Sequence, residues 1–199
     1  MMPAPHLQTC HRQVAALTFA VTFCVGTYSA ISSQSWRIDE TRTAIGFKID
    51  ATGFPTTRGH FLHFTGRIRI DFDHPAQSLT NFTVDSASVD VGSRSYNEFV
   101  KSSVLLDAAR FPTVSFTSTR VEKLDPRTAS VIGNLTMLGV TRQIALKVNV
   151  ETERSGNGRA VAFFATGSIK RSEFGMIFGI PLIDDTLEIT VKTRALTDE

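Results

Sequence analysis

The regular alternation of apolar and polar residues is the feature that most restricts how this chain can fold. In residues 62–72 the apolar side chains occupy even positions, whereas polar or charged side chains occupy odd positions. This two-residue period places one face of a β-strand in a core and the other in water. Shorter alternating runs recur, and their apolar members are Ile45, Phe47 and Ile49; Val89 and Val91; Val114 and Phe116; Val131, Leu135 and Met137; Ile144, Leu146, Val148 and Val150; and Leu187, Ile189 and Val191. The chain is therefore expected to belong to the all-β class.

Short turns separate these strand patterns. Residues 138–142 have the composition of a tight connection, and Ser155-Gly156-Asn157-Gly158 closes the next hairpin. About eight strands joined in this way predict an antiparallel eight-stranded barrel, with a two-layer sandwich as the alternative. The barrel is favoured because closure leaves no sheet edge exposed.

The strand pattern is interrupted once, between residues 91 and 112. Ser95 and Glu98 have the spacing of a helix-capping pair, and Phe99 and Leu105 belong to an apolar stripe that follows. Pro112 ends the segment because it has no backbone donor. The sequence thus predicts a short helical lid, built into the sheet and placed over one end of the barrel.

The first 32 residues have the layout of a secretory signal peptide. Residues 1–13 carry Arg12 and no acidic residue, and residues 14–31 are uncharged and mostly apolar. An uncleaved anchor is the alternative, although this length is marginal for spanning a bilayer. Cleavage is expected within residues 29–32, so that residues 33–199 form one domain that is periplasmic or secreted.

Both cysteines, Cys10 and Cys24, lie in this leader. Lipid attachment at Cys24 is disfavoured because Phe23 is too bulky for the small residue that such processing requires. The mature chain would contain no cysteine, so a hydrophobic core must supply its stability. The formal net charge of the whole chain is only +2. This near balance gives no electrostatic case for binding nucleic acid.

The aromatic composition suits an apolar interior. The chain has 15 phenylalanines but only two tyrosines and one tryptophan, so most aromatic rings carry no hydrogen-bonding group. A barrel of about eight strands either fills itself with side chains or holds one small ligand. From the residues alone, the phenylalanines either pack a core or line a dry tunnel.

A series of short motifs runs along almost the whole mature chain. They are Trp36-Arg37-Ile38-Asp39, Gly59-x-Phe61-x-x-Phe64-x-Gly66, Ser88-Val89-Asp90, Arg110-Phe111-Pro112-x-x-x-Phe116-x-Ser118 and Gly133-Asn134-Leu135-Thr136-Met137-x-Gly139-Val140-Thr141. In order and spacing this series resembles the YceI-like family of secreted bacterial lipid-binding proteins. The resemblance implies an elongated, lipocalin-like barrel that holds a polyisoprenoid as free lipid, quinone or phosphorylated carrier.

Two positions depart from the pattern of that family. Ala51 stands where members often have histidine, and Tyr96-Asn97 stands where they often have an arginine-aspartate pair. Both changes remove ionisable groups near the expected mouth, which favours a neutral head group such as a quinone or an alcohol. The head-group candidates are Tyr96, Asn97, Arg94 and Lys101.

No sequence signature of catalysis, cofactor binding or metal binding is present, such as G-x-S-x-G, a P-loop or H-E-x-x-H. His60 and His63 would point to opposite faces of a strand. His74 is expected in a solvated turn, with a surface metal site there as an outside alternative, and Asp184 and Asp185 are expected in a polar loop. The protein is therefore predicted to be no enzyme and to use no cofactor.

These observations predict a binding protein for an isoprenoid lipid or quinone, with membrane contact only as a transient lipid source. The alternatives are a structural or stress-related secreted barrel without lipid and a hydrolase acting on a small ester. The residues carry no signal of oligomeric state. The positions expected to line the ligand site are Phe47, Phe64, Ile68, Ile70, Phe99, Leu105, Phe116, Leu135, Met137, Ile144, Leu146 and Phe163.

Overall fold

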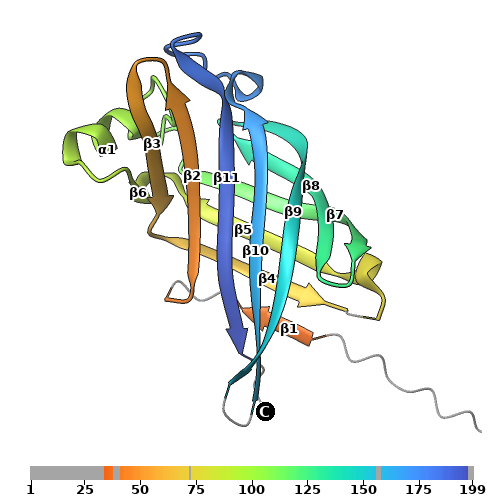
Figure 1. The fold of residues 1–199 in the computed structure, drawn as a ribbon. Coiled ribbons are helices and arrows are strands. Elements are labelled where there is room, and N and C mark those ends of the chain that lie inside the picture. The colour runs from red at the N-terminus through yellow and green to blue at the C-terminus, as the bar shows by residue number, and fades with distance from the viewer. Residues whose placement is uncertain (1–33, 38–40, 72, 156–157, 197–199) are drawn as a thin grey trace, which may run out of the picture. The chain divides into compact units, whose positions relative to one another are not determined.

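Antiparallel strands make up most of the computed structural model, which describes residues 34–37, 41–71, 73–155 and 158–196 (Figure 1). The α-helix α1 (Arg94–Lys101) and the short 3-10 helices η1 (Pro75–Gln77), η2 (Ser86–Ser88) and η3 (Arg171–Phe174) lie between strands. The strands are β1 (Gln34–Arg37), β2 (Thr43–Ala51), β3 (Phe54–Phe61), β4 (Phe64–Ile70), β5 (Leu79–Asp85), β6 (Val89–Asp90), β7 (Thr113–Asp125), β8 (Thr128–Met137), β9 (Val140–Ser155), β10 (Gly158–Lys170) and β11 (Ile183–Leu196). The predicted signal peptide and its cleavage site lie outside the described residues.

The strands form one curled sheet in the order β1-β4-β5-β7-β8-β9-β10-β11-β2-β3-β6. β3 pairs with β2, while β4, which follows β3 after two residues, pairs with β5. Two backbone hydrogen bonds hold this corner: Leu62 donates to Ser88 O (3.1 Å), and Asp85 donates to His63 O (2.9 Å). Because one continuous segment joins both ends of the sheet, the sheet curls into a barrel. The predicted all-β class, antiparallel barrel and short helix are confirmed.

The number of strands differs from the expected eight for a geometric reason. β3 and β4 are two halves of one bent segment, and β5 and β6 are likewise separated only by η2. Counting each bent segment once leaves, in the part of the chain that the structure describes, eight long strands and the short strand β1, which pairs with β4. The prediction of eight strands therefore describes the barrel wall. Two of these strands are each divided in two by a bend, which an alternation pattern does not reveal.

The corner between β3 and β4 also corrects the predicted strand over residues 62–72. Leu62 was expected on the dry face but is 50% exposed, whereas Phe64 and Ile68 are buried. Phe61, at an odd position, contacts the core. The inward face therefore changes from odd to even positions across the corner, and Phe72 lies outside the described residues.

The predicted lid is present, but its cap is not the expected one. Helix α1 begins at Arg94 with Ser93 as N-cap, and no side chain caps it, so the Ser95–Glu98 capping pair is wrong. The helix ends where Ser102 donates from both its backbone N–H and its hydroxyl to Phe99 O. Within the described part of the chain, no helix has the length and apolar character needed to cross a membrane.

Candidate functional site

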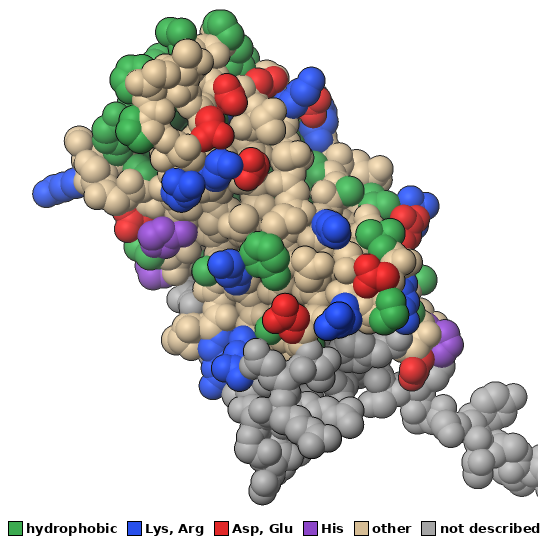
Figure 2. Space-filling view, in the orientation of Figure 1, with side chains coloured by type: hydrophobic (Ala, Val, Ile, Leu, Met, Phe, Trp, Pro, Cys, Tyr) green, Lys and Arg blue, Asp and Glu red, His purple; other side chains and the backbone are tan. Residues whose placement is uncertain are grey.

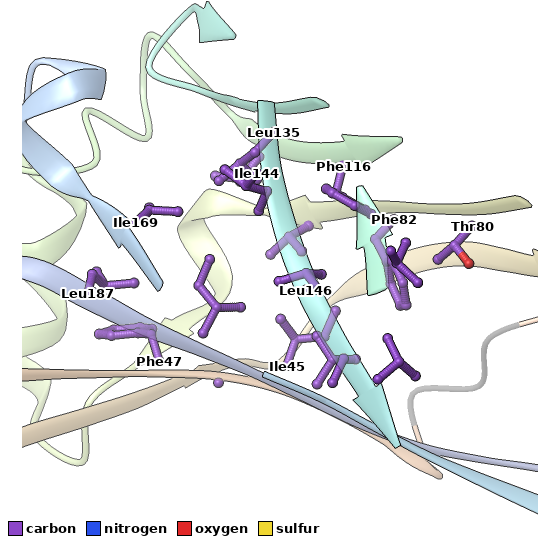
Figure 3. A pocket seen from close by; sticks show the side chains of 18 of the residues that line it. Ile45, Phe47, Thr80, Phe82, Phe116, Leu135, Ile144, Leu146, Ile169 and Leu187 are labelled. Atoms are coloured by element: carbon purple, nitrogen blue, oxygen red, sulfur yellow. The ribbon is translucent and has the colours of Figure 1, made fainter. Parts of the chain in front are cut away.

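The interior of the barrel contains a cavity of about 450 Å³, which falls within the usual range of about 300–1,000 Å³ for ligand pockets. Most of the described residues that line it are apolar. Figure 3 shows Phe47, Phe116 and Leu146, which come from β2, β7 and β9, pointing into the same space. The barrel is therefore hollow, and its wall suits an apolar ligand.

The cavity is long in the direction of the strands. The inward residues Ile144, Leu146, Val148 and Val150 of β9 all line it. A strand rises about 3.3 Å per residue, so these four positions cover about 20 Å. This run of aliphatic side chains forms a tunnel wall rather than a shallow pocket.

Most of the predicted lining residues do face this cavity. Eleven of the twelve positions line it: Phe47, Ile68, Ile70, Phe99, Leu105, Phe116, Leu135, Met137, Ile144, Leu146 and Phe163. Phe64 is the exception, because it is buried in the hydrophobic core next to the β3–β4 corner.

Other lining residues were not among the predicted positions. Phe61, Phe82 and Ile169 all contribute to the wall. Phe82 and Val84 alternate with polar residues in β5, so this short run carried a usable signal. Phe61 carried none, because its inward orientation depends on the corner.

The lid segment lines one end of the cavity. Tyr96, Phe99, Val100 and Leu105 all belong to the wall, although Tyr96 is 60% and Phe99 is 39% exposed. The ring of Phe99 meets the ring of Phe178 edge to face, with 5.5 Å between centroids. The lid thus closes against the connection between β10 and β11 through aromatic contact.

Three of the four head-group candidates do not line the cavity, and Tyr96 is the one that does. The side chain of Asn97 accepts from Val91 N–H (2.8 Å) and donates to Asp90 Oδ1 (3.1 Å). The Gly92 N–H, and then the Asn97 amide, lower the pKa of Asp90 below its usual value. Asn97 therefore fastens α1 to β6, and both its amide oxygen and its amide nitrogen are already hydrogen-bonded within the protein.

The two cationic candidates also point elsewhere. Lys101 Nζ lies 3.5 Å from Glu98 Oε1 on the same helix, and Arg94 is exposed. Neither belongs to the cavity wall. The lid end thus offers a phenol but no lining lysine or arginine from α1.

Arg171 is a buried cation that the sequence reasoning missed. It is 1% exposed and lines the cavity, and its guanidinium is hydrogen-bonded to four backbone carbonyls. It donates to Asp184 O (2.8 Å), Met176 O (3.0 Å), Phe178 O (2.7 Å) and Ile183 O (2.9 Å).

Burial lowers the pKa of Arg171, while the nearby carboxylates of Asp185 and Asp184 act in the opposite direction. Two of these carbonyls lie in the connection between β10 and β11, and two lie at the start of β11, so Arg171 organises this part of the chain. Four of the five N–H donors of its guanidinium are used in these bonds.

The opposite end of the cavity is polar. Lys123, Asp125, Arg127 and Thr128 line it where β7 turns into β8. The backbone N–H of Arg127, and then the hydroxyl of Thr128, lower the pKa of Asp125. Strand β8 runs for ten residues from Thr128 beside this turn to Met137 at the lid end, so the polar group and the lid occupy different ends.

The turn expected at His74 is present, and its backbone N–H groups bind the carboxylate of the neighbouring Asp71. Asp71 Oδ1 accepts from Asp73 N–H (3.0 Å) and His74 N–H (2.7 Å). His60 and His63 are exposed on either side of the β3–β4 corner. Among the described residues, no three His, Cys, Asp or Glu side chains are grouped to hold a metal ion.

Comparison with known proteins places this fold and cavity in a family. Residues 36–195 match the YceI-like domain. The chain is 26% identical over 190 residues to Protein YceI of Salmonella agona (strain SL483), covering 93% of this chain and 97% of that relative.

Two solved structures share the fold. Burkholderia cenocepacia BcnA is 25% identical with a TM-score of 0.72, over 79% of this chain and 99% of that one. A polyisoprenoid binding domain from Saccharophagus degradans, implicated in plant cell wall breakdown, is 15% identical with a TM-score of 0.64, over 84% and 100% of the two chains. The domain match and the full-length likeness to Protein YceI show that this chain belongs to the YceI-like family.

Proposed function

We propose that this protein is a secreted or periplasmic binding protein that holds one long-chain isoprenoid lipid inside its barrel. The observation that carries the proposal is the long, mostly apolar cavity. Burying apolar ligand surface in such a wall is the dominant source of affinity. The polyisoprenoid binding domain of Saccharophagus degradans, which has the same fold, supports this ligand class.

The chain length of the ligand sets the affinity. Ligands of this size gain at most about 0.3 kcal/mol per heavy atom, so a chain of about 40 carbons would contribute no more than about 12 kcal/mol. The dissociation constant would then be no lower than about 1 nM. Binding of this kind needs a continuous apolar wall and no catalytic group.

We further propose that the head group is neutral, as in a quinone or a polyprenol. At the lid end Tyr96 is the head-group candidate that reaches the wall, and Arg171 is committed to four carbonyls. A diphosphate would need unengaged cations or backbone donors there.

The secreted or periplasmic location rests on the basic and apolar character of residues 1–31. An isoprenoid is nearly insoluble in water, so a carrier in an aqueous compartment outside the cytoplasm would keep it dispersed. Membrane contact in this proposal serves as the transient source of the lipid.

The proposal is tested on the full chain, expressed in a bacterial host and purified without detergent. Organic extraction followed by mass spectrometry should recover about one isoprenoid per protein chain. An extract without isoprenoid, together with no binding of added polyprenol or quinone, would contradict the proposal and leave a structural barrel. Turnover of a small ester that one substitution abolishes would instead support a hydrolase.

A further inference from the structure

Large apolar side chains project into solvent around the lid end of the barrel. Phe54 is 73% exposed, Ile177 68%, Leu182 65% and Phe178 45%. We call these four residues the apolar rim. Figure 2 shows apolar side chains gathered at the end where α1, the β2–β3 hairpin and the β10–β11 connection lie in Figure 1. Contiguous exposed apolar surface of this kind marks an interaction site.

The loops that carry the rim contain no charged residue. Residues 51–57 and residues 174–183 include no Asp, Glu, Lys or Arg. Solvent-facing loops are normally polar, so two adjacent uncharged loop tips are unusual for a surface that stays in water. This composition favours an apolar environment over an aqueous one.

The rim is held in place by specific bonds. Arg171 donates to the carbonyls of Met176 and Phe178 in the β10–β11 connection and to that of Ile183, the first residue of β11. Thr52 N–H donates to Leu182 O (2.8 Å), which joins the β2–β3 hairpin to the same connection. The backbone polar groups are thus turned inward, while the rim side chains are presented outward.

The rim is also continuous with the cavity. Phe178 contacts Phe99, which lines the cavity. Met176 and Ile183, on either side of the rim segment, line the cavity as well, whereas Phe54, Ile177 and Leu182 do not. The apolar surface therefore extends from the cavity wall around the lid to the outside of the barrel.

We propose that the apolar rim inserts into the surface of a lipid bilayer, where the ligand passes between the membrane and the cavity. This inference rests on the proposed function, since it assigns the partner from which that ligand comes. Uncharged, projecting side chains suit the boundary between head groups and acyl chains, where buried apolar area sets the binding strength. A lipid leaving the bilayer at the rim would meet apolar surface until it reaches the cavity.

The test is flotation of the purified protein with vesicles of phosphatidylethanolamine and phosphatidylglycerol, mixed roughly three to one. The rim variant combines Phe54→Ser, Ile177→Ser and Leu182→Ser. The matched control combines Leu79→Ser and Leu124→Ser, two side chains that are 48% and 58% exposed and lie outside the cavity wall. We expect the rim variant to bind vesicles at least about tenfold more weakly than wild type, and the control to bind like wild type.

A second readout separates this inference from the proposed function. Binding of a polyprenol delivered in detergent should stay within about twofold of wild type in the rim variant, because the substituted residues do not line the cavity. Wild type that does not bind polyprenol but still floats with vesicles in a rim-dependent way would overturn the proposed function. It would support the binding of the rim to membranes.

Equal flotation of wild type and rim variant would overturn the inference. The inference would also be overturned if the protein does not float but self-associates, and the rim substitutions abolish this self-association. A second copy of the chain would then cover the rim. Ile177→Trp provides an independent check, because brominated lipids should quench the fluorescence of the introduced tryptophan, whereas the fluorescence introduced by Leu124→Trp should be unaffected.

Discussion

At the lid end the cavity wall includes Tyr96, Phe99 and Leu105, and the buried cation there, Arg171, is bound to backbone carbonyls. At the other end, where β7 turns into β8, the wall includes Lys123 and Arg127. The apolar end also carries the rim of uncharged loops, whereas the polar end carries ordinary solvated side chains. Under the proposed function, this difference predicts that a lipid would enter at the lid end, tail first, and would leave its head group near the lid.

The largest expected effect comes from charging the wall between the two ends. Ile70→Asp places a carboxylate in the cavity wall, where an unpaired charge costs several kcal/mol. We expect the variant to unfold or to lose at least about 100-fold in isoprenoid affinity, measured by circular dichroism and by binding. The control Thr65→Asp, on the exposed face of β4, should retain both. Unchanged folding and binding in Ile70→Asp would show that the inward face is misassigned.

The next effect concerns the lid end and its buried cation. Arg171→Met removes the donors of four backbone carbonyls, and unsatisfied buried groups cost about 1–3 kcal/mol each before relaxation. We expect the free energy of unfolding to fall by about 3 kcal/mol in denaturant titrations. Arg171→Lys should recover only part of this loss, because lysine lacks the planar fork. A variant as stable as wild type would mean that the connection holds its shape without Arg171.

A smaller, pH-dependent effect on stability is expected at Asp185, which binds Ser172 next to Arg171. The backbone N–H and the hydroxyl of Ser172 lower the pKa of Asp185. A depressed pKa in the folded state adds stability at pH values above the usual aspartate pKa of about 3.9. This stability is lost as the pH falls through the lower, folded-state pKa. Asp185→Asn should therefore lower the melting temperature at neutral pH, with a difference from wild type that shrinks in acid.

The matched control for Asp185→Asn is Glu173→Gln, an exposed change in η3 next to Ser172, the partner of Asp185. It should show little difference from wild type at any pH. A deficit of Asp185→Asn that stays constant from neutral pH into acid would show that the carboxylate charge contributes nothing there.

The smallest effect is expected at the polar end. Combining Lys123→Gln with Arg127→Gln should change isoprenoid affinity by less than about twofold, because exposed charges contribute little and the head group lies at the lid. Isothermal titration with a quinone and with a polyprenyl phosphate checks both head-group types. A loss of about tenfold or more in affinity would place the head group at the β7–β8 turn. It would contradict a head group at the lid end.

The sequence predicted the parts of the wall that follow a two-residue period. Ile68, Ile70, Ile144 and Leu146 face the cavity as the alternation requires. The period fails at bends: Leu62 is exposed because β3 turns into β4 beside it. Such corners depend on pairing with other strands, which a local pattern does not contain.

Two further features lay beyond the reach of local patterns. A register shift between Ser118 and Arg120 turns Val121 inward and brings Lys123 to the cavity. Arg171 gained its role from carbonyls up to 13 residues away, and nothing in its neighbourhood marks it as buried. The polar end and the organised rim therefore became visible only in three dimensions.

The claim that the cavity itself holds the lipid is tested most directly by filling the cavity. Ala165 lines it and is 9% exposed, so Ala165→Phe adds a ring inside the barrel, while Ser168→Phe adds the same ring on the exposed face of β10. Polyprenol titrations should show at least about tenfold weaker binding for Ala165→Phe, with the fold retained, and wild-type affinity for Ser168→Phe. Equal affinity in all three proteins would contradict the account, because the ligand would then bind outside the cavity.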